Sequence, residues 1–120
     1  MKILIADDSK ASRMFLKNMI ETILSSAEIE FLFAEDGDVA IQRFAEADPD
    51  LVFLDLTMPK KNGMEALQAI LALNPEAKVV VVTADAQKAS HDKALTIGAL
   101  DYITKPIPEH TLARKLLSWL

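Results

Sequence analysis

Three short apolar runs stand out in the sequence, and none of them alternates with polar residues. They cover residues 3–6, 51–54 and 79–82. Strands that are apolar at every position are typical of the middle of a parallel sheet that is covered by helices on both faces. Residues 28–34 begin with alternating polar and apolar side chains, and residues 100–104 are short and mixed in character. These two segments are therefore predicted to be edge strands.

Helical periodicity fills the segments between and after these strands. It predicts five helices, whose apolar stripes are Ala11, Phe15, Met19 and Ile23; Val39, Ala40 and Phe44; Met64, Leu67, Ile70 and Leu71; Ala94, Leu95 and Ile97; and Leu112, Leu116 and Trp119. Ser9 is a suitable N-cap for the first helix, and Gly98 suits the end of the fourth. The chain is thus a strand followed by a helix, five times over.

Alternating strand and helix units predict an α/β fold with a parallel sheet and right-handed crossovers. For five strands we expect a doubly wound (βα)5 domain over residues 1–120, with the flavodoxin-like strand order 2-1-3-4-5. Ligands of such folds bind at the carboxyl ends of the strands, where the order reverses between the first and third strands. The residues that directly follow each apolar run are therefore the candidates for a site.

Composition narrows the possible functions. Apolar residues make up 51% of the chain and charged residues 26%, which is typical of a globular domain. The formal charge of −5 argues against nucleic acid as the main partner, and the absence of cysteine excludes disulfides and thiolate sites. The longest uninterrupted apolar run, residues 69–73, is too short to cross a bilayer, and the N-terminus has no signal-peptide pattern. We expect a cytoplasmic protein without a membrane partner.

Charged and hydroxyl side chains follow four of the five predicted strands: Asp7 and Asp8, Asp55, Thr83, and Lys105. Carboxylates that converge stay ionised only beside a compensating cation. Three carboxylates and one ammonium carry a formal charge of −2, which one Mg²⁺ or Mn²⁺ would neutralise, and oxygen ligands favour these ions over zinc. Such a pocket suits phosphoryl transfer, with a carboxylate as the nucleophile that forms an acyl phosphate.

The ordered motifs resemble the receiver domain of two-component response regulators. They are Asp7-Asp8, Asp55-Leu56-Thr57-Met58-Pro59 with Gly63, Thr83-Ala84, and Tyr102 followed by Lys105-Pro106. The resemblance covers the whole chain, and it implies that Asp55 is the phosphoacceptor. It also implies a Mg²⁺ site. The direct ligands would be Asp8, Asp55 and the backbone carbonyl of Thr57, and Asp7 would act through water.

The resemblance implies roles for the remaining motif residues. Lys105 pairs first with the acceptor carboxylate and then with the phosphoryl group, and the Lys105–Pro106 bond is cis. Thr83 and Tyr102 relay phosphorylation to the face formed by the fourth helix, the fifth strand and the fifth helix, and we expect Tyr102 to exchange an outward position for an inward one. Thr57 and Asp85 lie two residues beyond the acceptor and the threonine, where the side chains tune hydrolysis.

The expected function is that of a phosphorylation-switched signalling module. A histidine kinase or a histidine phosphotransfer protein would supply the phosphoryl group, and an unidentified downstream protein, or a second copy of the chain, would sense it. Because the domain would catalyse only its own phosphorylation and dephosphorylation, we do not expect an enzyme in the usual sense. We expect a stand-alone receiver like the chemotaxis regulators, with part of a longer regulator as the alternative.

Two other classes of protein fit the predicted fold less well. Haloacid-dehalogenase-like phosphatases need an Asp-x-Asp pair after the first strand, whereas Asp7 and Asp8 are adjacent. Flavodoxin-like nucleotide or flavin binders need a phosphate loop rich in glycine or hydroxyl residues there, and all three glycines lie elsewhere. His91 and His110 are predicted to be helical surface residues away from the strand ends, rather than phosphorylation sites.

Overall fold

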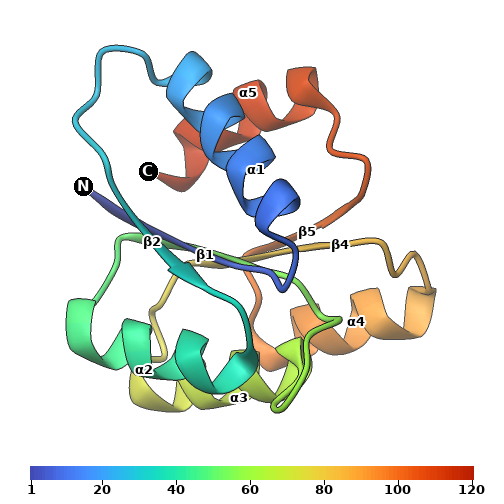
Figure 1. Ribbon diagram of the computed structural model, residues 1–120. Helices are drawn as coiled ribbons and strands as arrows, with labels where there is room; N and C mark the ends of the chain where they lie inside the picture. The colour runs from blue at the N-terminus through green and yellow to red at the C-terminus, as the bar shows by residue number, and fades with distance from the viewer.

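The computed structural model describes residues 1–120 and contains five strands that alternate with five helices (Figure 1). The strands are β1 (Lys2–Ala6), β2 (Glu30–Ala34), β3 (Leu51–Leu54), β4 (Val79–Thr83) and β5 (Asp101–Thr104). The helices are α1 (Lys10–Ile23), α2 (Gly37–Ala47), α3 (Gly63–Leu73), α4 (Lys88–Ile97) and α5 (Glu109–Trp119). The strands pair in parallel in the order β2-β1-β3-β4-β5, which confirms the predicted fold class.

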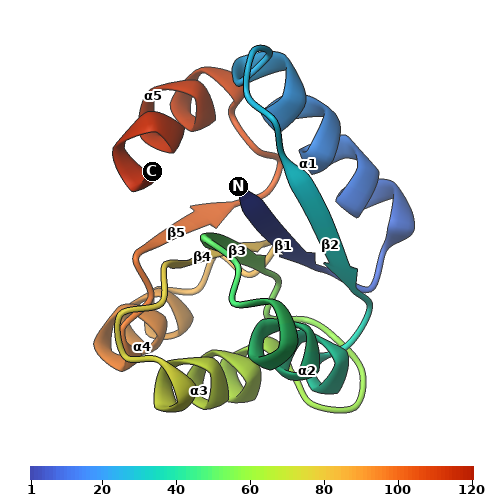
Figure 2. The same ribbon diagram turned by 90° about the vertical axis from the view of Figure 1, so that its left-hand side faces the viewer.

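Two layers of helices cover the sheet, with α1 and α5 on one face and α2, α3 and α4 on the other (Figures 1 and 2). Alternate residues of the central strands enter the two layers, because successive side chains of a strand point to opposite faces. The residues toward α1 and α5 are Ile3, Ile5, Leu51, Phe53, Val80 and Val82. Those toward the other helices are Leu4, Ala6, Val52, Leu54, Val79 and Val81. Every position of the three apolar runs is therefore buried, as predicted.

Side-chain caps fix where several helices begin. The Ser9 hydroxyl accepts a hydrogen bond from the Ser12 amide at the start of α1, as predicted, and Asp36 caps α2 in the same way. Asn62 and Glu65 form a reciprocal capping box at the start of α3. At the end of α4, Gly98 has a φ of 129°, a backbone conformation that favours glycine. The caps at Ser9 and Asn62 mark the ends of the loops that follow β1 and β3.

The predicted apolar stripe of α1 is partly wrong. The side of α1 that faces the core presents Leu16, Met19 and Ile20, whereas Phe15 is 60% exposed. A step of four residues turns about 40° beyond a full helical turn, so a line of such steps gradually leaves the buried face. The edge strands also begin later than predicted, at Glu30 and Asp101.

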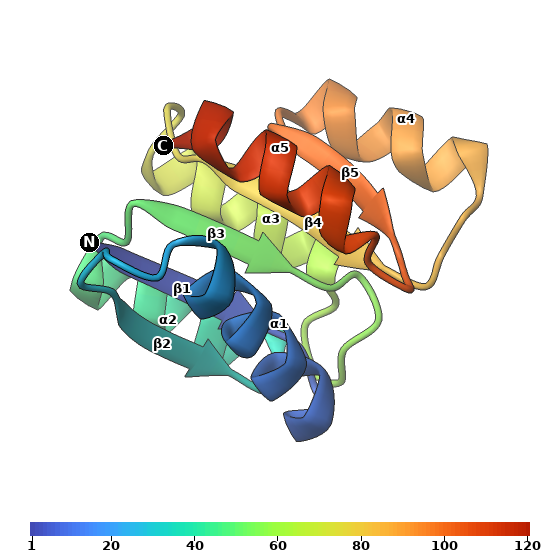
Figure 3. The same cartoon turned by 90° about the horizontal axis from the view of Figure 1, so that it is seen from above.

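The strands all end at one edge of the sheet, which Figure 3 shows from the side of α1 and α5. Helix α1 leaves this edge onto one face, whereas α2 and α3 cover the other face, so the topology switches between β1 and β3. A site is expected at this position in an open α/β sheet. No helix has both the length and the apolar character needed to cross a membrane.

Candidate functional site

The sheet itself positions four of the predicted site residues. Asp7 follows β1, Asp55 follows β3, Thr83 is the last residue of β4 and Lys105 follows β5. The backbone ladder continues beyond the strands, because the amide of Asp7 donates to the last residue of β2 (2.9 Å) and that of Asp55 to the last residue of β1 (2.9 Å). The amide of Lys105 donates to the carbonyl of Thr83 at 2.8 Å. These residues thus lie on rigid extensions of the sheet.

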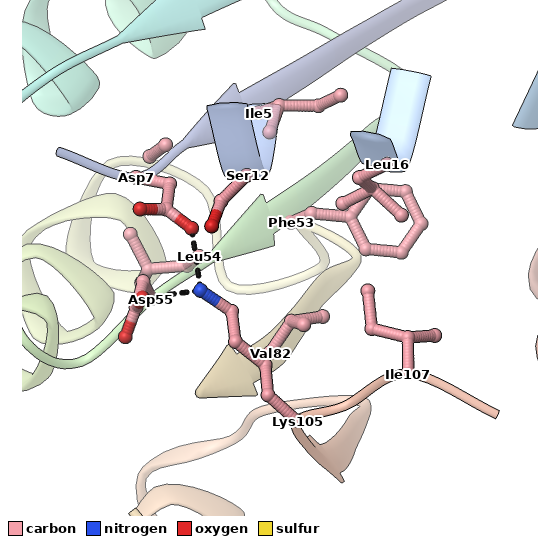
Figure 4. A pocket seen from close by; sticks show the side chains of 11 residues that line it. Ile5, Asp7, Ser12, Leu16, Phe53, Leu54, Asp55, Val82, Lys105 and Ile107 are labelled. Carbon is pink, nitrogen blue, oxygen red and sulfur yellow. Dashed lines mark hydrogen bonds and ion pairs between the residues drawn. The ribbon is translucent and has the colours of Figure 1, made fainter. Parts of the chain in front are cut away.

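The ammonium of Lys105 bridges two buried carboxylates at the centre of the site (Figure 4). Its Nζ lies 2.7 Å from Asp7 Oδ2 and 2.9 Å from Asp55 Oδ2. Both aspartates are only 6% exposed. The second oxygen of each carboxylate accepts a backbone hydrogen bond, from the Ser9 amide at 2.9 Å for Asp7 and from the Thr57 amide at 3.0 Å for Asp55. Each carboxylate is therefore oriented through both of its oxygens.

The protonated form of Lys105 is stabilised by these contacts. Burial alone would lower the pKa of Lys105, but the hydrogen bonds and charges of Asp7 and Asp55 outweigh burial and raise that pKa above its usual value. The ammonium is therefore charged at neutral pH, so that it compensates the paired carboxylates. The Lys105–Pro106 peptide bond is cis, as the resemblance implied.

Apolar side chains form the floor of the site beneath the ammonium (Figure 4). They are Ile5, Leu16, Phe53, Val82 and Ile107. The cavity among them has a volume of about 10 Å³, which is the lower limit for holding one water molecule. Charges above such an apolar, close-packed floor interact more strongly than charges in bulk water.

The predicted magnesium ligands are only partly gathered. Asp7 and Asp55 meet at the Lys105 ammonium, whereas Asp8 is exposed on the adjoining loop, and the structure brings no group of three acidic, histidine or cysteine side chains into a metal-binding arrangement. The donor set nevertheless fits a hard divalent cation in its chemistry, because every donor is oxygen and the formal charge is −2. Exposed Asp8 and the exposed loop residue Thr57 flank the two buried carboxylates.

The predicted switch residues meet at the backbone of Asp85. Thr83 is fully buried, and its hydroxyl oxygen accepts a hydrogen bond from the Asp85 amide at 3.3 Å. The hydroxyl of Tyr102, which is 8% exposed, donates to the Asp85 carbonyl at 2.5 Å. Burial, together with the negative charges of Asp85 and Asp55, raises the pKa of the Tyr102 phenol. Tyr102 is thus turned inward without a phosphoryl group, which corrects the expectation of an outward position, because the Asp85 carbonyl offers its hydroxyl an acceptor.

Sequence reasoning missed two neighbours of this switch on α4. The Ser90 hydroxyl donates to Asp85 Oδ2 at 2.6 Å, and the imidazole of His91 packs edge-on against Tyr102, with ring centroids 5.1 Å apart. His91 is a helical surface residue, as predicted, with a side chain that is 45% exposed, but its ring also packs against Tyr102, which was not predicted. No motif marks either residue. The only sequence signal is the placement of both in the first turns of a helix that follows Asp85.

Two glycines allow the loop between β3 and α3 to pack tightly. A Cβ atom on Gly63 would lie 2.1 Å from the carbonyl oxygen of Asp55, and one on Gly37 would lie 1.8 Å from that of Lys61. Both distances are far shorter than any van der Waals contact, so only glycine fits at either position. The loop that carries Thr57 is consequently held between the start of α2 and the residue after β3.

A doubly wound sheet with a buried carboxylate–lysine cluster at its topological switch point defines a class of signalling domain. Residues 3–117 match the family model of the response regulator receiver domain, and the chain belongs to this family. It is similar to the chemotaxis protein CheY of Listeria monocytogenes, with 40% identity over 107 residues that cover 88% of this chain and 87% of that protein. The chemotaxis protein CheY of Thermotoga maritima is 37% identical over 105 residues, covering 88% and 85%.

Solved structures agree with this assignment. The crystal structure of the CheX–CheY–BeF3–Mg²⁺ complex from Borrelia burgdorferi matches with a TM-score of 0.89 and 27% identity, and covers 98% of this chain and 87% of that one. The response regulator domain of Thermotoga maritima CheB matches with a TM-score of 0.82 and 35% identity, covering 98% and 91%. The chain is a receiver domain of the CheY type.

Proposed function

We propose that the chain accepts a phosphoryl group on Asp55 from the phosphohistidine of a histidine kinase or a histidine phosphotransfer protein. The observation that carries this proposal is the Lys105 ammonium held between the buried carboxylates of Asp7 and Asp55. An oxygen of Asp55 attacks the phosphorus in line, forming a P–O bond while the P–N bond to the donor imidazole breaks. The products are an aspartyl phosphate and the free histidine.

The neighbours of Asp55 stabilise the charge that develops on the transferring group. Lys105 leaves the carboxylate oxygen and pairs with a phosphoryl oxygen, and the Thr83 hydroxyl donates to another. We assign a magnesium site to Asp8, Asp55 and the Thr57 carbonyl, with Asp7 acting through water. A magnesium ion bound there would supply positive charge for the phosphoryl oxygens and relieve the repulsion among the three aspartates.

Hydrolysis returns the chain to its starting state. Water attacks the phosphorus, the P–O bond to Asp55 breaks, and inorganic phosphate leaves. The chain thus catalyses only its own modification and its reversal, and turns over no separate substrate. Thr57 and Asp85 flank the phosphoryl position, and we assign to them an influence on the rate of this step.

Phosphorylation then changes a distant surface. A phosphoryl group adds about −1.5 to −2 charge and three acceptor oxygens beside Thr83. Thr83 and Tyr102 pass this change to the face formed by α4, β5 and α5, where a downstream protein or a second copy of the chain binds. The structure of a CheX–CheY complex with BeF3 and Mg²⁺ supports a partner-binding role for this type of domain. We also propose that residues 1–120 form one domain that acts through protein contacts. A cytoplasmic location stays a prediction.

Intact mass measurement tests the phosphoacceptor directly. With Mg²⁺ and acetyl phosphate, the wild-type chain should gain one phosphoryl group, and removal of Mg²⁺ with EDTA should prevent the gain. Asp55→Asn should gain none, whereas Asp36→Asn is a matched control, because Asp36 is also a buried carboxylate (4% exposed) and asparagine preserves its helix cap. A phosphoryl group on Asp55→Asn, or one mapped to a serine, threonine or histidine, would contradict the proposal.

A further inference from the structure

The start of α4 holds the side chain of Asp85 through both carboxylate oxygens, with one donor from its N-cap residue and one from its first turn. Ser90 donates its hydroxyl proton to Asp85 Oδ2 at 2.6 Å, and the Gln87 amide donates to Oδ1 at 2.9 Å. The Ser90 hydrogen bond, followed by that of Gln87, lowers the pKa of Asp85, so its carboxylate stays charged and the bonds are charge-assisted. Asp85 is therefore anchored to α4 rather than free in the loop after β4.

This anchored residue supplies the acceptor for Tyr102. The Tyr102 hydroxyl donates to the Asp85 carbonyl. The imidazole of His91 packs against the Tyr102 ring from the side of α4, at an interplanar angle of 65°. Edge-on aromatic contacts of this kind are favourable beyond simple burial. The inward position of Tyr102 is thus supported at its hydroxyl by Asp85, which Ser90 anchors, and at its ring by His91.

We propose that Ser90 and His91 are positioning residues of the switch, which hold Tyr102 inward before any phosphoryl group is present. Through Asp85 and by direct packing, they set the resting balance between the inward and outward positions of Tyr102. The inference rests on the proposed role of Thr83 and Tyr102 as the switch. It goes beyond that role because it assigns the resting balance to two residues of α4 that never contact Asp55 in the mechanism.

The Thr83 hydroxyl would connect a phosphoryl group on Asp55 to this arrangement of Asp85 and Tyr102. A hydroxyl has one donor and two acceptor positions, and in this structure the Thr83 oxygen accepts from the Asp85 amide. Its proton is free to donate to a phosphoryl oxygen while that bond persists. Phosphorylation therefore adds a hydrogen bond to a network that is already assembled in this structure and shifts the balance further toward the inward position.

The single tyrosine of the chain makes the inference measurable. In protein labelled with 3-fluorotyrosine, one ¹⁹F resonance reports the environment of Tyr102 alone. We compare the wild type, Ser90→Ala and His91→Ala before and after treatment with Mg²⁺ and beryllofluoride. Ser118→Ala and His110→Ala are matched controls on α5, because the Ser118 hydroxyl also bonds within its helix and His110 is exposed. Circular dichroism confirms that each variant is folded.

We expect Ser90→Ala and His91→Ala to move the resting resonance toward that of urea-unfolded protein, and beryllofluoride to move it back. Loss of one ordinary hydrogen bond corresponds to about a fivefold fall in the ratio of inward to outward Tyr102. Resting spectra of both variants that match those of the wild type and the controls would overturn the inference. If beryllofluoride changes no spectrum, including that of the wild type, the proposed switch fails, whereas the resting spectra still decide the roles of Ser90 and His91.

Discussion

Replacing Lys105 with methionine should destabilise the unmodified protein strongly. Lys105→Met keeps an unbranched side chain over the apolar floor of the site but removes the only cation between Asp7 and Asp55. Both carboxylates are 6% exposed, so water cannot take over the role of the ammonium efficiently. The change thus turns a satisfied ion cluster into two buried like charges.

The size of the effect follows from the distances. Asp7 Oδ2 and Asp55 Oδ2 lie 2.7 and 2.9 Å from the same nitrogen, so they are less than about 6 Å apart. Two unit charges at that separation repel by about 3 kcal/mol at an effective dielectric constant near 20. This value lies at the lower end of the range for breaking buried ion pairs, in keeping with a lysine side chain that is 24% exposed. A loss of about 3 kcal/mol corresponds to a fall in Tm of about 10 °C.

Urea unfolding followed by circular dichroism measures this difference, with Lys115→Met as the control. Lys115 also bonds to a carboxylate, that of Asp101 at 2.8 Å. This ion pair involves only one carboxylate and is more exposed than the Lys105 cluster, so we expect the unfolding free energy to fall by less than about 1 kcal/mol. The double variant Lys105→Met/Asp55→Asn should recover most of the lost stability, because only one buried charge remains. Equal losses in Lys105→Met and Lys115→Met, or no recovery in the double variant, would refute the electrostatic reasoning.

Three further predictions test other parts of the structure. Gly37→Ala should lower the unfolding free energy by about 1–3 kcal/mol in urea titrations, because its Cβ would overlap the Lys61 carbonyl 1.8 Å away. Tyr102 should ionise at higher pH in the native protein than in urea, as followed by phenolate absorbance. Since its native pKa is raised above 10.0, the stabilisation is present below that pH and is lost as the pH rises through the native pKa. Thr83→Ala should still gain a phosphoryl group by mass spectrometry, yet beryllofluoride should no longer alter its partner binding or self-association.

The sheet and the edge that carries the site were predictable because burial leaves a strong trace in the sequence. Strands covered on both faces must be apolar at every position, so the first polar residue after each run marks the carboxyl end of a strand. Asp7, Asp55 and Thr83 each occupy that position after an apolar run, whereas Lys105 follows the mixed edge strand. Their convergence is expected because the carboxyl ends of parallel strands meet at one edge of the sheet. The Ser9 cap likewise depends on local chemistry that the sequence displays directly.

Other features depend on contacts that no local pattern records. Asp7 and Asp8 carry identical side chains, and only the fold shows that Asp7 turns inward to Lys105 while Asp8 faces solvent. The bond from Tyr102 to Asp85 spans 17 residues and two secondary-structure elements, so nothing near His91 indicated its place beside that tyrosine. The exposure of Phe15 has a different cause, because a regular four-residue spacing of apolar side chains drifts off the buried face of a helix.

Asp7, Asp55 and Lys105 are attached to the sheet, whereas the residues that contact Tyr102 from α4 and the loop before it are not. The amides of the three attached residues extend the backbone ladder between neighbouring strands, whereas Asp85, Ser90 and His91 belong to a loop and the helix that follows it. Changes at Ser90 and His91 can therefore alter the surface around Tyr102 without moving Asp7, Asp55 or Lys105. Under the proposed function, one reaction site of fixed geometry can in this way serve many outputs, each adapted by replacing a few side chains around a single tyrosine.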